Sequence, residues 1–523
     1  MSLRPSFMGI ESMKQTLFSA QKSLDITGNN ISNVNTVGYS RQRADQVSVS
    51  VISESLYFNT STDLAGQGTA TSGVTQLRDQ ILDQRYREVN SGTALSGTCY
   101  DTLKDIENIL DVIDTSGFNG VYQKFCDAIS QFGTDNSDRG EIANVTMEYA
   151  KQMCQALKNY DTQLNQIQDQ IATQAETAVE EVNTILNNIA QLNEQLKNGY
   201  VSFGDITVDH SYEAGYMAND TYGPLELKDK INELVDQLST YGNVRTSNEP
   251  DGTFTVEFAG TVAVQGERAK DYYVDYDKND GSMGIYYKPD TKVNASAGEL
   301  ASGELRAYLD MYNGAGCYAA ELGSGYDGMS NGIAYYKGMI DALANTMATA
   351  FNEACEAKEG DMFAKSGEPL DRFTAKNIVV SDEWKKDPSL ITYGPEGKDG
   401  MEMEELNPRY VYKVMSVIDK DLEFKRFDGG NIDQSGMTID DFITYESDKL
   451  AQDISYCESV YDAYDTMAVT LANQRDSVMG VSLDEEGANM MTYQKWYNAA
   501  ARMMTALDEA LDTIINGMGL VGR

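Results

Sequence analysis

The segment closest to a metal site is the acidic run from Asp275 to Gly281, which reads Asp-Tyr-Asp-Lys-Asn-Asp-Gly. A calcium loop of the EF-hand type needs glycine at its sixth position and a bidentate glutamate at its twelfth. Here glycine is the seventh residue and the twelfth is Tyr286. The run predicts an acidic turn, with a loose surface ion site as the alternative, and we assign no metal to the protein.

Residues for acid–base or nucleophilic catalysis are scarce. His210 is the single histidine of the chain, so His-dependent triads and multi-histidine metal sites are excluded. The glycines between 314 and 328 are followed by no Gly-Lys-Ser or Gly-Lys-Thr, which argues against a phosphate-binding loop. Carboxylates are so abundant that no particular pair is specified. We therefore expect no enzyme, no catalytic residue and no cofactor.

The six cysteines do not form a local motif. No two of them lie closer than 27 residues along the chain, so a Cys-x-x-Cys redox pair and a zinc knuckle are both excluded. We expect six unpaired and mostly buried thiols that pack as small apolar side chains. The cysteines are Cys99, Cys126, Cys154, Cys317, Cys355 and Cys457.

Charge is distributed unevenly over the 523 residues. Lys and Arg together number 41 against 81 Asp and Glu, a formal net charge of −40. Residues 1–50 hold five basic and three acidic side chains, and residues 480–523 hold three basic and six acidic ones. The acidity therefore lies in the middle of the chain. Because phosphate-binding surfaces need clustered Lys and Arg, nucleic acid and anionic membranes are not expected partners.

No stretch of the sequence is apolar enough for a signal-peptide core or a membrane span. On these rules alone the protein would be placed in the cytosol, without membrane insertion.

Both ends of the chain carry apolar residues in sevens, the spacing of a coiled coil. Near the N-terminus the residues at one heptad position, from Leu3 to Ile31, are large and apolar. The residues three positions further along the chain are Ser6, Met13, Ala20 and Thr27. The two ends therefore predict helices that pair with one another, whereas the alternative is two amphipathic helices that each pack on a local core. The predicted interface residues are Leu3, Ile10, Leu17, Leu24 and Ile31 at one end, and Met490, Tyr497, Met504, Leu507, Leu511 and Ile514 at the other.

The middle of the chain predicts a helical bundle with insertions. Apolar residues recur every seven positions from Leu157 to Leu192, and no proline interrupts 141–198, which predicts one long helix or two. After Gly199 the period changes to two, with a strand over 254–258 and a hairpin over 272–287. A shorter strand is expected over 378–380, and a helix near 225–238.

The expected fold is mainly α and elongated, with four parts. Residues 1–55 and 478–523 form a terminal coiled coil. Residues 56–200, 305–356 and 440–477 form the helical bundle. Residues 201–304 form a β-rich outer domain, and residues 357–439 a small mixed one.

One segment near each end carries a recognisable signature. Residues 24–42 read LDITGNNISNVNTVGYSRQ, and residues 480–489 read GVSLDEEGAN. The first closely resembles the N-terminal signature of bacterial flagellar axial proteins, the rod and hook family, and the second resembles the matching C-terminal end. The signature residues are Asn29, Asn30, Asn33, Asn35, Gly38, Tyr39, Asp484, Glu485 and Glu486.

The resemblance implies a structural role in the flagellum. The Gly-Val-x-Leu-Asp-Glu-Glu form and the chain length resemble the class that joins hook to filament and is needed for filament assembly. Such proteins are exported unfolded through the flagellar type III pathway without a cleaved signal peptide, so the expected location becomes extracellular. The implied partners are copies of the chain in a ring, hook protein, a second junction protein (hook-associated protein 3), an export chaperone and the export apparatus.

Two other interpretations stay open on the sequence. One is hook protein itself or another rod or hook protein. The other is a secreted hydrolase or adhesin carried on axial-protein ends, with its activity in 201–439.

The same patterns predict how the ends become ordered. Two narrow apolar seams bury limited area, and glycine and asparagine weaken helices. We expect neighbouring copies to supply the missing contacts, so that ordering of the ends is coupled to polymerisation.

Overall fold

The computed structural model is mainly α, as predicted. It describes residues 6–48, 68–114, 117–131, 139–204, 225–249, 252–278, 280–288, 294–295, 300–323, 325–328, 330–355, 361–367, 369, 371–388, 408–425 and 431–517. The predicted interface residue Leu3 and the single histidine, His210, lie outside these ranges.

Long helices make up most of the structure. The longer ones are α1 (Ser6–Ser32), α3 (Gln80–Asp114), α4 (Phe118–Gln131), α5 (Arg139–Gly204), α6 (Leu225–Tyr241), α7 (Glu304–Asn313), α9 (Ile333–Cys355), α12 (Pro408–Ile418), α13 (Ile439–Met479) and α14 (Leu483–Asp512). The short ones are a 3-10 turn (Gly316–Tyr318), α8 (Ala319–Leu322), α10 (Asp382–Lys386) and a π turn (Thr513–Gly517) that extends α14.

The strands form small antiparallel sheets. They are β1 (Gln42–Ser48), β2 (Thr69–Gln76), β3 (Val244–Asn248), β4 (Phe254–Phe258), β5 (Thr261–Gln265), β6 (Arg268–Ala269), β7 (Asp271–Tyr276), β8 (Met283–Lys288), β9 (Asn294–Ala295), β10 (Phe363–Lys365), β11 (Ile378–Val380), β12 (Leu422–Lys425) and β13 (Asn431–Met437). The sheet orders are β1-β2, β3-β4-β5-β6, β7-β8-β9, β10-β11 and β12-β13.

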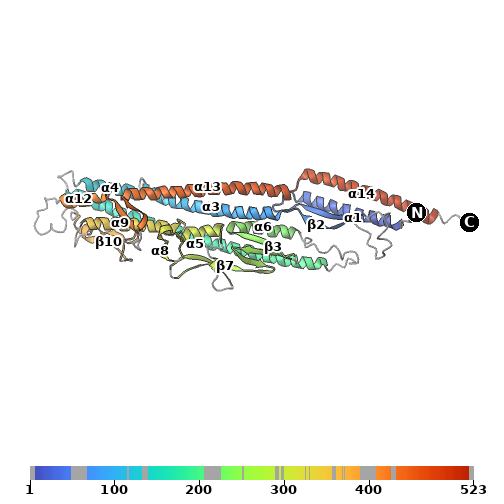
Figure 1. Ribbon diagram of the computed structural model, residues 1–523, viewed down its shortest axis with the longest axis horizontal. Helices are drawn as coiled ribbons and strands as arrows, with labels where there is room; N and C mark the ends of the chain where they lie inside the picture. The colour runs from blue at the N-terminus through green and yellow to red at the C-terminus, as the bar shows by residue number, and fades with distance from the viewer. Residues whose placement is uncertain are drawn as a thin grey trace.

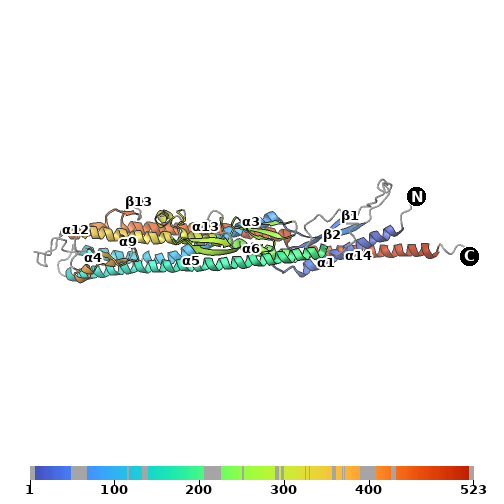
Figure 2. The same ribbon diagram turned by 90° about the horizontal axis from the view of Figure 1, so that it is seen from below.

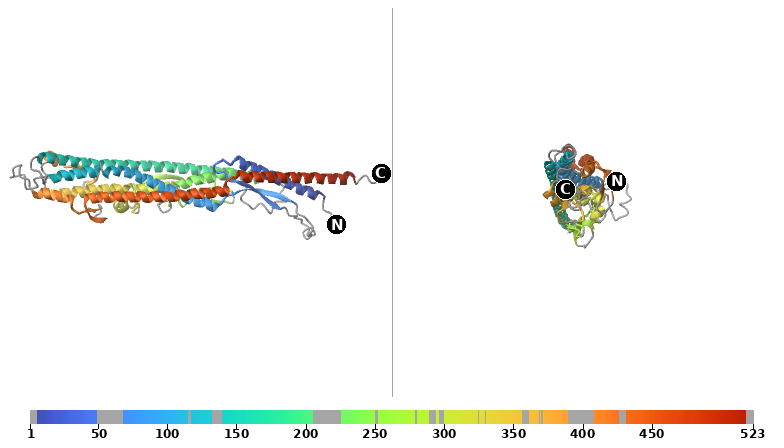
Figure 3. Two further views of the ribbon diagram at one scale, coloured as in Figure 1. Left: turned by 90° about the horizontal axis from the view of Figure 1, so that it is seen from above. Right: turned by 90° about the vertical axis from the view of Figure 1, so that its left-hand side faces the viewer.

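The elements are arranged as a rod, with both chain ends at the same end of it (Figure 1). Two views at right angles show α13 running along α3 and α14 continuing in nearly the same direction after a bend (Figures 1 and 2), and the view from above agrees (Figure 3). α1 packs beside α14, and the β1-β2 hairpin packs on α1. The predicted pairing of the two ends is therefore present.

The α3–α13 pair is antiparallel and depends on glycine for its close approach. A Cβ at Gly92 would lie 2.8 Å from a ring carbon of Tyr464, and one at Gly97 would lie 3.1 Å from Tyr461. Because glycine has no side chain, the two tyrosine rings lie directly on the α3 backbone.

At the far end of the rod, α4, α9, α12 and the first half of α5 share one core. Phe125 and Phe351 meet edge to face, with ring centroids 5.3 Å apart. Phe363 and Trp384, from the small segment after α9, are buried in the same core. The predicted strand over 378–380 is β11.

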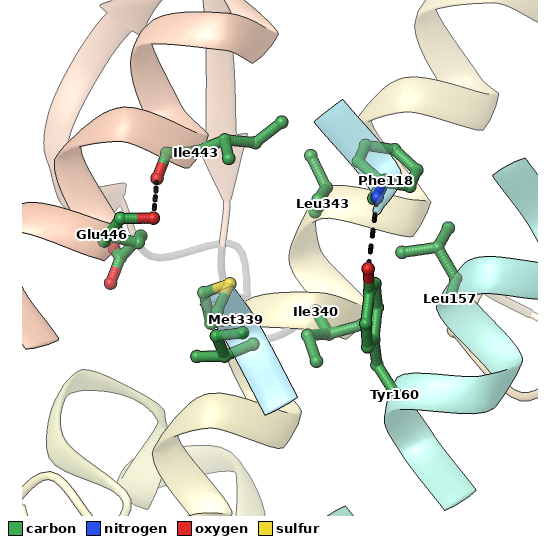
Figure 4. Close-up of a pocket in the computed structure, with 10 residues that line it drawn as sticks. Phe118, Leu157, Tyr160, Met339, Ile340, Leu343, Ile443 and Glu446 are labelled. Atoms are coloured by element: carbon green, nitrogen blue, oxygen red, sulfur yellow. Dashed lines mark hydrogen bonds between the residues drawn. The ribbon is translucent and has the colours of Figure 1, made fainter. Parts of the chain in front are cut away.

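A cavity of about 20 Å³ remains in this core (Figure 4). Its lining is apolar apart from a few groups, among them Tyr160, whose hydroxyl accepts a hydrogen bond of 3.1 Å from the Phe118 N–H. The space suits one water molecule and is too small for a substrate.

The long apolar repeat after residue 157 forms part of one continuous helix, α5. Its second half carries a separate core that includes residues from β3 to β8. The Asn193 side chain completes this contact, since its amide group donates to the Phe254 carbonyl at 2.8 Å and accepts from the Phe254 N–H at 2.9 Å. The predicted strand over 254–258 is β4, and the predicted hairpin is β7-β8, where Tyr273 pairs with Tyr286.

None of the helices within the described ranges combines the length and apolar character that crossing a membrane would require.

Candidate functional site

The two terminal signatures meet where α1 ends and α14 begins, although they are separated by more than 400 residues of sequence. We call this region the neck, defined by residues 28–42 and 476–487. α1 ends in a turn that its own asparagines close: the Asn33 N–H donates to the Asn29 carbonyl at 3.1 Å, and the Asn33 side chain donates to it at 3.0 Å. Gly38 follows with a φ of 78°, a backbone conformation that favours glycine.

Asn30 is the centre of the neck and is 1% exposed. Its side-chain oxygen accepts from the Tyr39 hydroxyl at 2.8 Å and from the Gln42 N–H at 3.0 Å. Its side-chain nitrogen donates to the Gln42 carbonyl at 2.9 Å and to the Glu486 carboxylate at 3.2 Å. A carboxylate could not donate these last two bonds, so the position requires an amide.

Arg41 connects both sides of the break between α13 and α14. Its N–H donates to the Met479 carbonyl at the end of α13, at 2.9 Å. Its guanidinium group lies 2.7 Å from a carboxylate oxygen of Glu485 and 2.7 Å from one of Glu486, in the first turn of α14. Burial lowers the pKa of Arg41, but the hydrogen bonds and charges of the two glutamates outweigh burial, and the net shift is upward.

The start of α14 is suited to acidic residues. The Ser482 hydroxyl caps the helix by accepting from the Glu485 N–H, and Asp484, Glu485 and Glu486 occupy the first turn. Carboxylates are stabilised there by the unpaired N–H groups of the helix start. The Leu-Asp-Glu-Glu part of the signature therefore makes a helix start that also binds Arg41.

Immediately toward the bundle lies a network of three arginines and three aspartates that sequence reasoning missed. Asp83 lies 3.0 Å from Arg78 and 2.8 Å from Arg475, and Asp236 lies 2.6 Å from both Arg87 and Arg475. The sixth residue, Asp229, lies 3.5 Å from Arg78 and accepts from the Ser40 hydroxyl at 2.7 Å. The network joins α3, α6 and α13 to the neck.

The pKa values of two of these aspartates shift in opposite directions. Burial raises the pKa of Asp83, but its hydrogen bond to Arg78 and the charges of Arg78, Arg475 and Arg87 outweigh burial, so the pKa is lowered. Burial raises the pKa of Asp229, and the hydrogen bonds from Ser40 and the Arg78 charge only partly oppose this. The sequence holds one signal that could have pointed to this arginine–aspartate network, which is the scarcity of basic residues in the acidic middle of the chain.

Comparisons with known proteins show which family the chain belongs to. The family model described as "Flagellar hook-associated protein FlgK helical domain" matches residues 103–370, about half of the chain. The chain belongs to the FlgK family. It is a structural component of the bacterial flagellum, at the junction between hook and filament.

Two further family models match the ends. "Flagella basal body rod protein" matches residues 15–39, and "Flagellar basal body rod FlgEFG protein C-terminal" matches residues 472–517. The first match includes the last half of α1 and its closing turn, and the second includes the end of α13 and all of α14. Both matches reach the neck. The rod and hook models match only the ends, which favours a FlgK-family protein over hook protein itself.

Curated relatives are similar to the chain over nearly its whole length. The "Flagellar hook-associated protein 1" of Bacillus subtilis is 27% identical and is covered over 99% of both chains. Proteins of the same name from Salmonella typhimurium and Escherichia coli are 22% and 21% identical over 96% of this chain and 98% of theirs. A solved structure, "flagellar hook junction protein FlgK" from Burkholderia pseudomallei, matches at 16% identity with a TM-score of 0.41, over 54% of this chain and 46% of that one.

In this FlgK-family chain the seam residues divide into two rows. The first, which we call the small row, consists of Ala20, Thr27, Glu486, Ala500 and Leu507. The first four are buried, and a Cβ at Gly9 of α1 would lie 3.3 Å from Leu507. Met13 and Tyr493, at the same heptad positions, are partly buried.

The second row, which we call the large row, holds the predicted interface residues Ile10, Leu17, Leu24, Ile31, Met490, Tyr497, Met504 and Leu511. None of these side chains is buried, and Met490 and Tyr497 are 37% and 39% exposed. Ile514, beyond the end of α14, is also exposed. The structure thus buries most of the small row and leaves the large row partly exposed.

The remaining signature and cysteine residues are placed as follows. Asn35 is exposed and lines a hollow beside the neck, and Asp484 is exposed on the first turn of α14. None of the six cysteines forms a disulfide, and Cys99, Cys154 and Cys355 are buried. Across the described part of the chain, His, Cys, Asp and Glu side chains form no group of three that could hold a metal ion.

Proposed function

We propose that copies of this chain contact one another through the large row, and that these contacts build the ring between hook and filament. The observation that carries the proposal is the division of the seam. Small side chains let α1 and α14 approach closely within one chain, and the larger ones are left partly in water. Exposed contiguous apolar surface marks a site of association.

The distribution of charge supports the same arrangement. Residues at the two ends are nearly neutral, whereas the middle of the chain carries most of the −40 net charge. Copies would repel one another if the acidic middle were packed together, and they would attract if the neutral ends were. The ring therefore has its contacts at the terminal helices and its acidic body in solvent.

We propose the four-part division of the chain as its functional layout. The contacts between copies are made by residues 1–55 and 478–523. The supporting bundle consists of residues 56–200, 305–356 and 440–477. Residues 201–304 and 357–439 face outward. The core between the second half of α5 and the β-rich part is separate from the bundle core, which supports a distinct part over 201–304, whereas 357–439 shares the bundle core through Phe363 and Trp384.

We also propose the finer partners and the route. The ring would bind hook protein on one side and a second junction protein on the other, after export with a cytoplasmic chaperone through the flagellar export apparatus without a cleaved signal peptide. The role is non-enzymatic. Family membership and the engagement of the charged neck residues with one another support this interpretation.

The test is a charge placed in the large row. Tyr497→Asp is expected to leave the melting of the purified monomer nearly unchanged, because Tyr497 is already partly exposed, and to reduce incorporation into flagella at least about tenfold. The matched control is Thr492→Asp, an exposed position of α14 whose hydroxyl bonds only to its own helix, at the Ala488 carbonyl.

Both variants would be expressed in cells that lack the native protein, and the chain would be measured in the medium and in isolated flagella. Export with failed incorporation of Tyr497→Asp alone supports the proposal. Equal incorporation of both variants would show that the large row makes no contact between copies.

A further inference from the structure

The terminal helix pair and the bundle are joined by few connections. α13 and α14 are separated by Gly480, Val481 and Ser482, and Gly480 has an extended backbone, with φ −68° and ψ 152°. The helical hydrogen-bond ladder is interrupted at this point, so the helices themselves do not set the angle between them.

Arg41 is the residue that spans this interruption. Its backbone bonds α13 at Met479, its carbonyl accepts from the Leu77 N–H at 2.9 Å, and its guanidinium group binds the first turn of α14. The Glu486 side chain is 3% exposed and that of Arg41 is 19% exposed, so this ion pair is shielded from water. A guanidinium group that holds two carboxylates fixes direction as well as distance.

The segment that carries Arg41 is itself attached to the bundle. The Ser40 N–H and hydroxyl donate to Asp229 at 3.1 and 2.7 Å, and Asp229 belongs to the arginine–aspartate network. Arg41 therefore connects a base fixed on α6 to the first turn of α14.

Two hollows beside the neck provide space for such a tilt. One of about 660 Å³ is lined by the turn after α1 and by the α13–α14 break, and one of about 440 Å³ lies between Val37, Tyr86 and Arg475. Val37 lines both hollows and is 84% exposed. The turn after α1 therefore borders open space on two sides.

We propose that Arg41 is a positioning residue that fixes the direction of the α1–α14 pair relative to the bundle, and that opening its ion pairs with Glu485 and Glu486 lets the pair tilt about Gly480. This inference rests on the proposed function, in which one subunit contacts unlike neighbours on its two sides. A subunit between two different assemblies needs its contact helices to be oriented separately from its body.

The test uses the purified full-length monomer and three variants. Arg41→Ala removes both ion pairs and keeps the backbone bond to Met479, and Glu486→Gln keeps an acceptor for Asn30 but removes the buried charge. Arg43→Ala is the matched control, because Arg43 lies two residues further on, in β1, and among the described residues its 61% exposed side chain pairs only with Asp45.

Two measurements are made on each variant: amide hydrogen exchange at residues 483–487, and the distance distribution from small-angle X-ray scattering. For Arg41→Ala and Glu486→Gln we expect exchange at least about tenfold faster at the neck and a broadened distribution of long distances. Exchange within the bundle core should not change.

The proposal is overturned if Arg41→Ala matches Arg43→Ala in both measurements. It is also overturned if the melting temperature of the bundle falls together with neck protection, because Arg41 would then stabilise the whole fold. Both measurements concern the monomer, so they are independent of whether Tyr497→Asp blocks assembly.

Discussion

The helices α9 and α14 differ sharply in how much of each is buried. Thirteen of the 23 residues of α9 are buried, whereas two of the 30 residues of α14 are. Both helices carry apolar residues at helical spacing. α9 has neighbours on most sides within the chain, and α14 is covered along one side by α1. Apolar periodicity alone therefore does not distinguish a core helix from one that stays largely exposed in the single chain.

The two regions also use polar groups differently. Around α9 the core is mostly apolar and aromatic. At the neck the contact is made by polar groups. The Asn30 amide donates to Glu486, and Arg41 forms ion pairs with Glu485 and Glu486. Directional bonds can set an angle between two bodies, while apolar burial is non-directional and mainly supplies stability.

The largest effect on monomer stability is expected in the bundle core. Phe351→Ala removes a fully buried ring that contacts Phe125 and Phe363 and should lower the free energy of unfolding by about 3–5 kcal/mol. Met503→Ala, at a 52% exposed position of α14, should change it by about 0.5 kcal/mol or less. Urea unfolding of both monomers measures this, and similar losses would contradict the contrast between the two regions.

A smaller effect is expected from Asp341 on α9, whose pKa is raised to about 6, chiefly by burial. A carboxyl group whose pKa is higher in the folded state favours folding when protonated, so stability falls as the pH rises from about 4 through 6. Asp161 adds to the shift, while the Ala375 N–H, Arg372 and Lys337 oppose it.

Asp341→Asn keeps an acceptor for the Ala375 N–H, which is 2.8 Å from the native carboxylate. The variant should be more stable than the native chain by about 1–2 kcal/mol at pH 7, and the difference should vanish below about pH 4. Thermal unfolding from pH 4 to 8 checks this. A difference that does not depend on pH would mean that ionisation of Asp341 does not affect stability.

A charge in the small row should have little effect on the bundle but a large one on assembly. Leu507→Asp places a carboxylate against Gly9 in the α1–α14 contact, so incorporation into flagella should fail. The main melting transition should shift by less than about 2 °C, because the bundle core is not touched. Leu17→Asp, in the large row, should likewise prevent incorporation and shift the main melting transition by less than about 2 °C. A large loss of bundle stability in either variant would show that the ends belong to the subunit's own core.

Proteolysis of the monomer should show that the neck is protected and that the rest of α14 is sensitive. This prediction involves no change in the stability of the protein. The outer part of α14 has little burial, whereas Glu486 is held by Asn30 and Arg41. In the monomer the first cuts are expected beyond residue 490 and before residue 20, with the neck protected, and assembled flagella should be resistant throughout. This narrows the expectation that the ends become ordered on polymerisation, because the neck is expected to be ordered already in the monomer. Early cutting at the neck in the monomer would contradict it.

Several elements could be predicted from the sequence because their cause is local. The lack of proline and the regular apolar repeat specify α5, and alternation with turn residues specifies β4 and the β7-β8 hairpin. The pairing of the two ends followed from matching heptads, and the family from two short signatures. Local periodicity and turn chemistry carry this information within a few residues.

Only the tertiary structure determined which residues of each seam are buried within one chain and which stay partly exposed. The heptad pattern gives both rows the same period, and the choice depends on how closely two backbones approach, which the small side chains permit. The contacts in the neck also could not be predicted from the sequence. Arg41 and Glu486 are 445 residues apart in sequence, and the partners of Arg78, Arg87 and Arg475 lie on two helices, α3 and α6. A charged residue in an acidic chain has many possible partners by sequence, and only packing brings one of them within hydrogen-bonding distance.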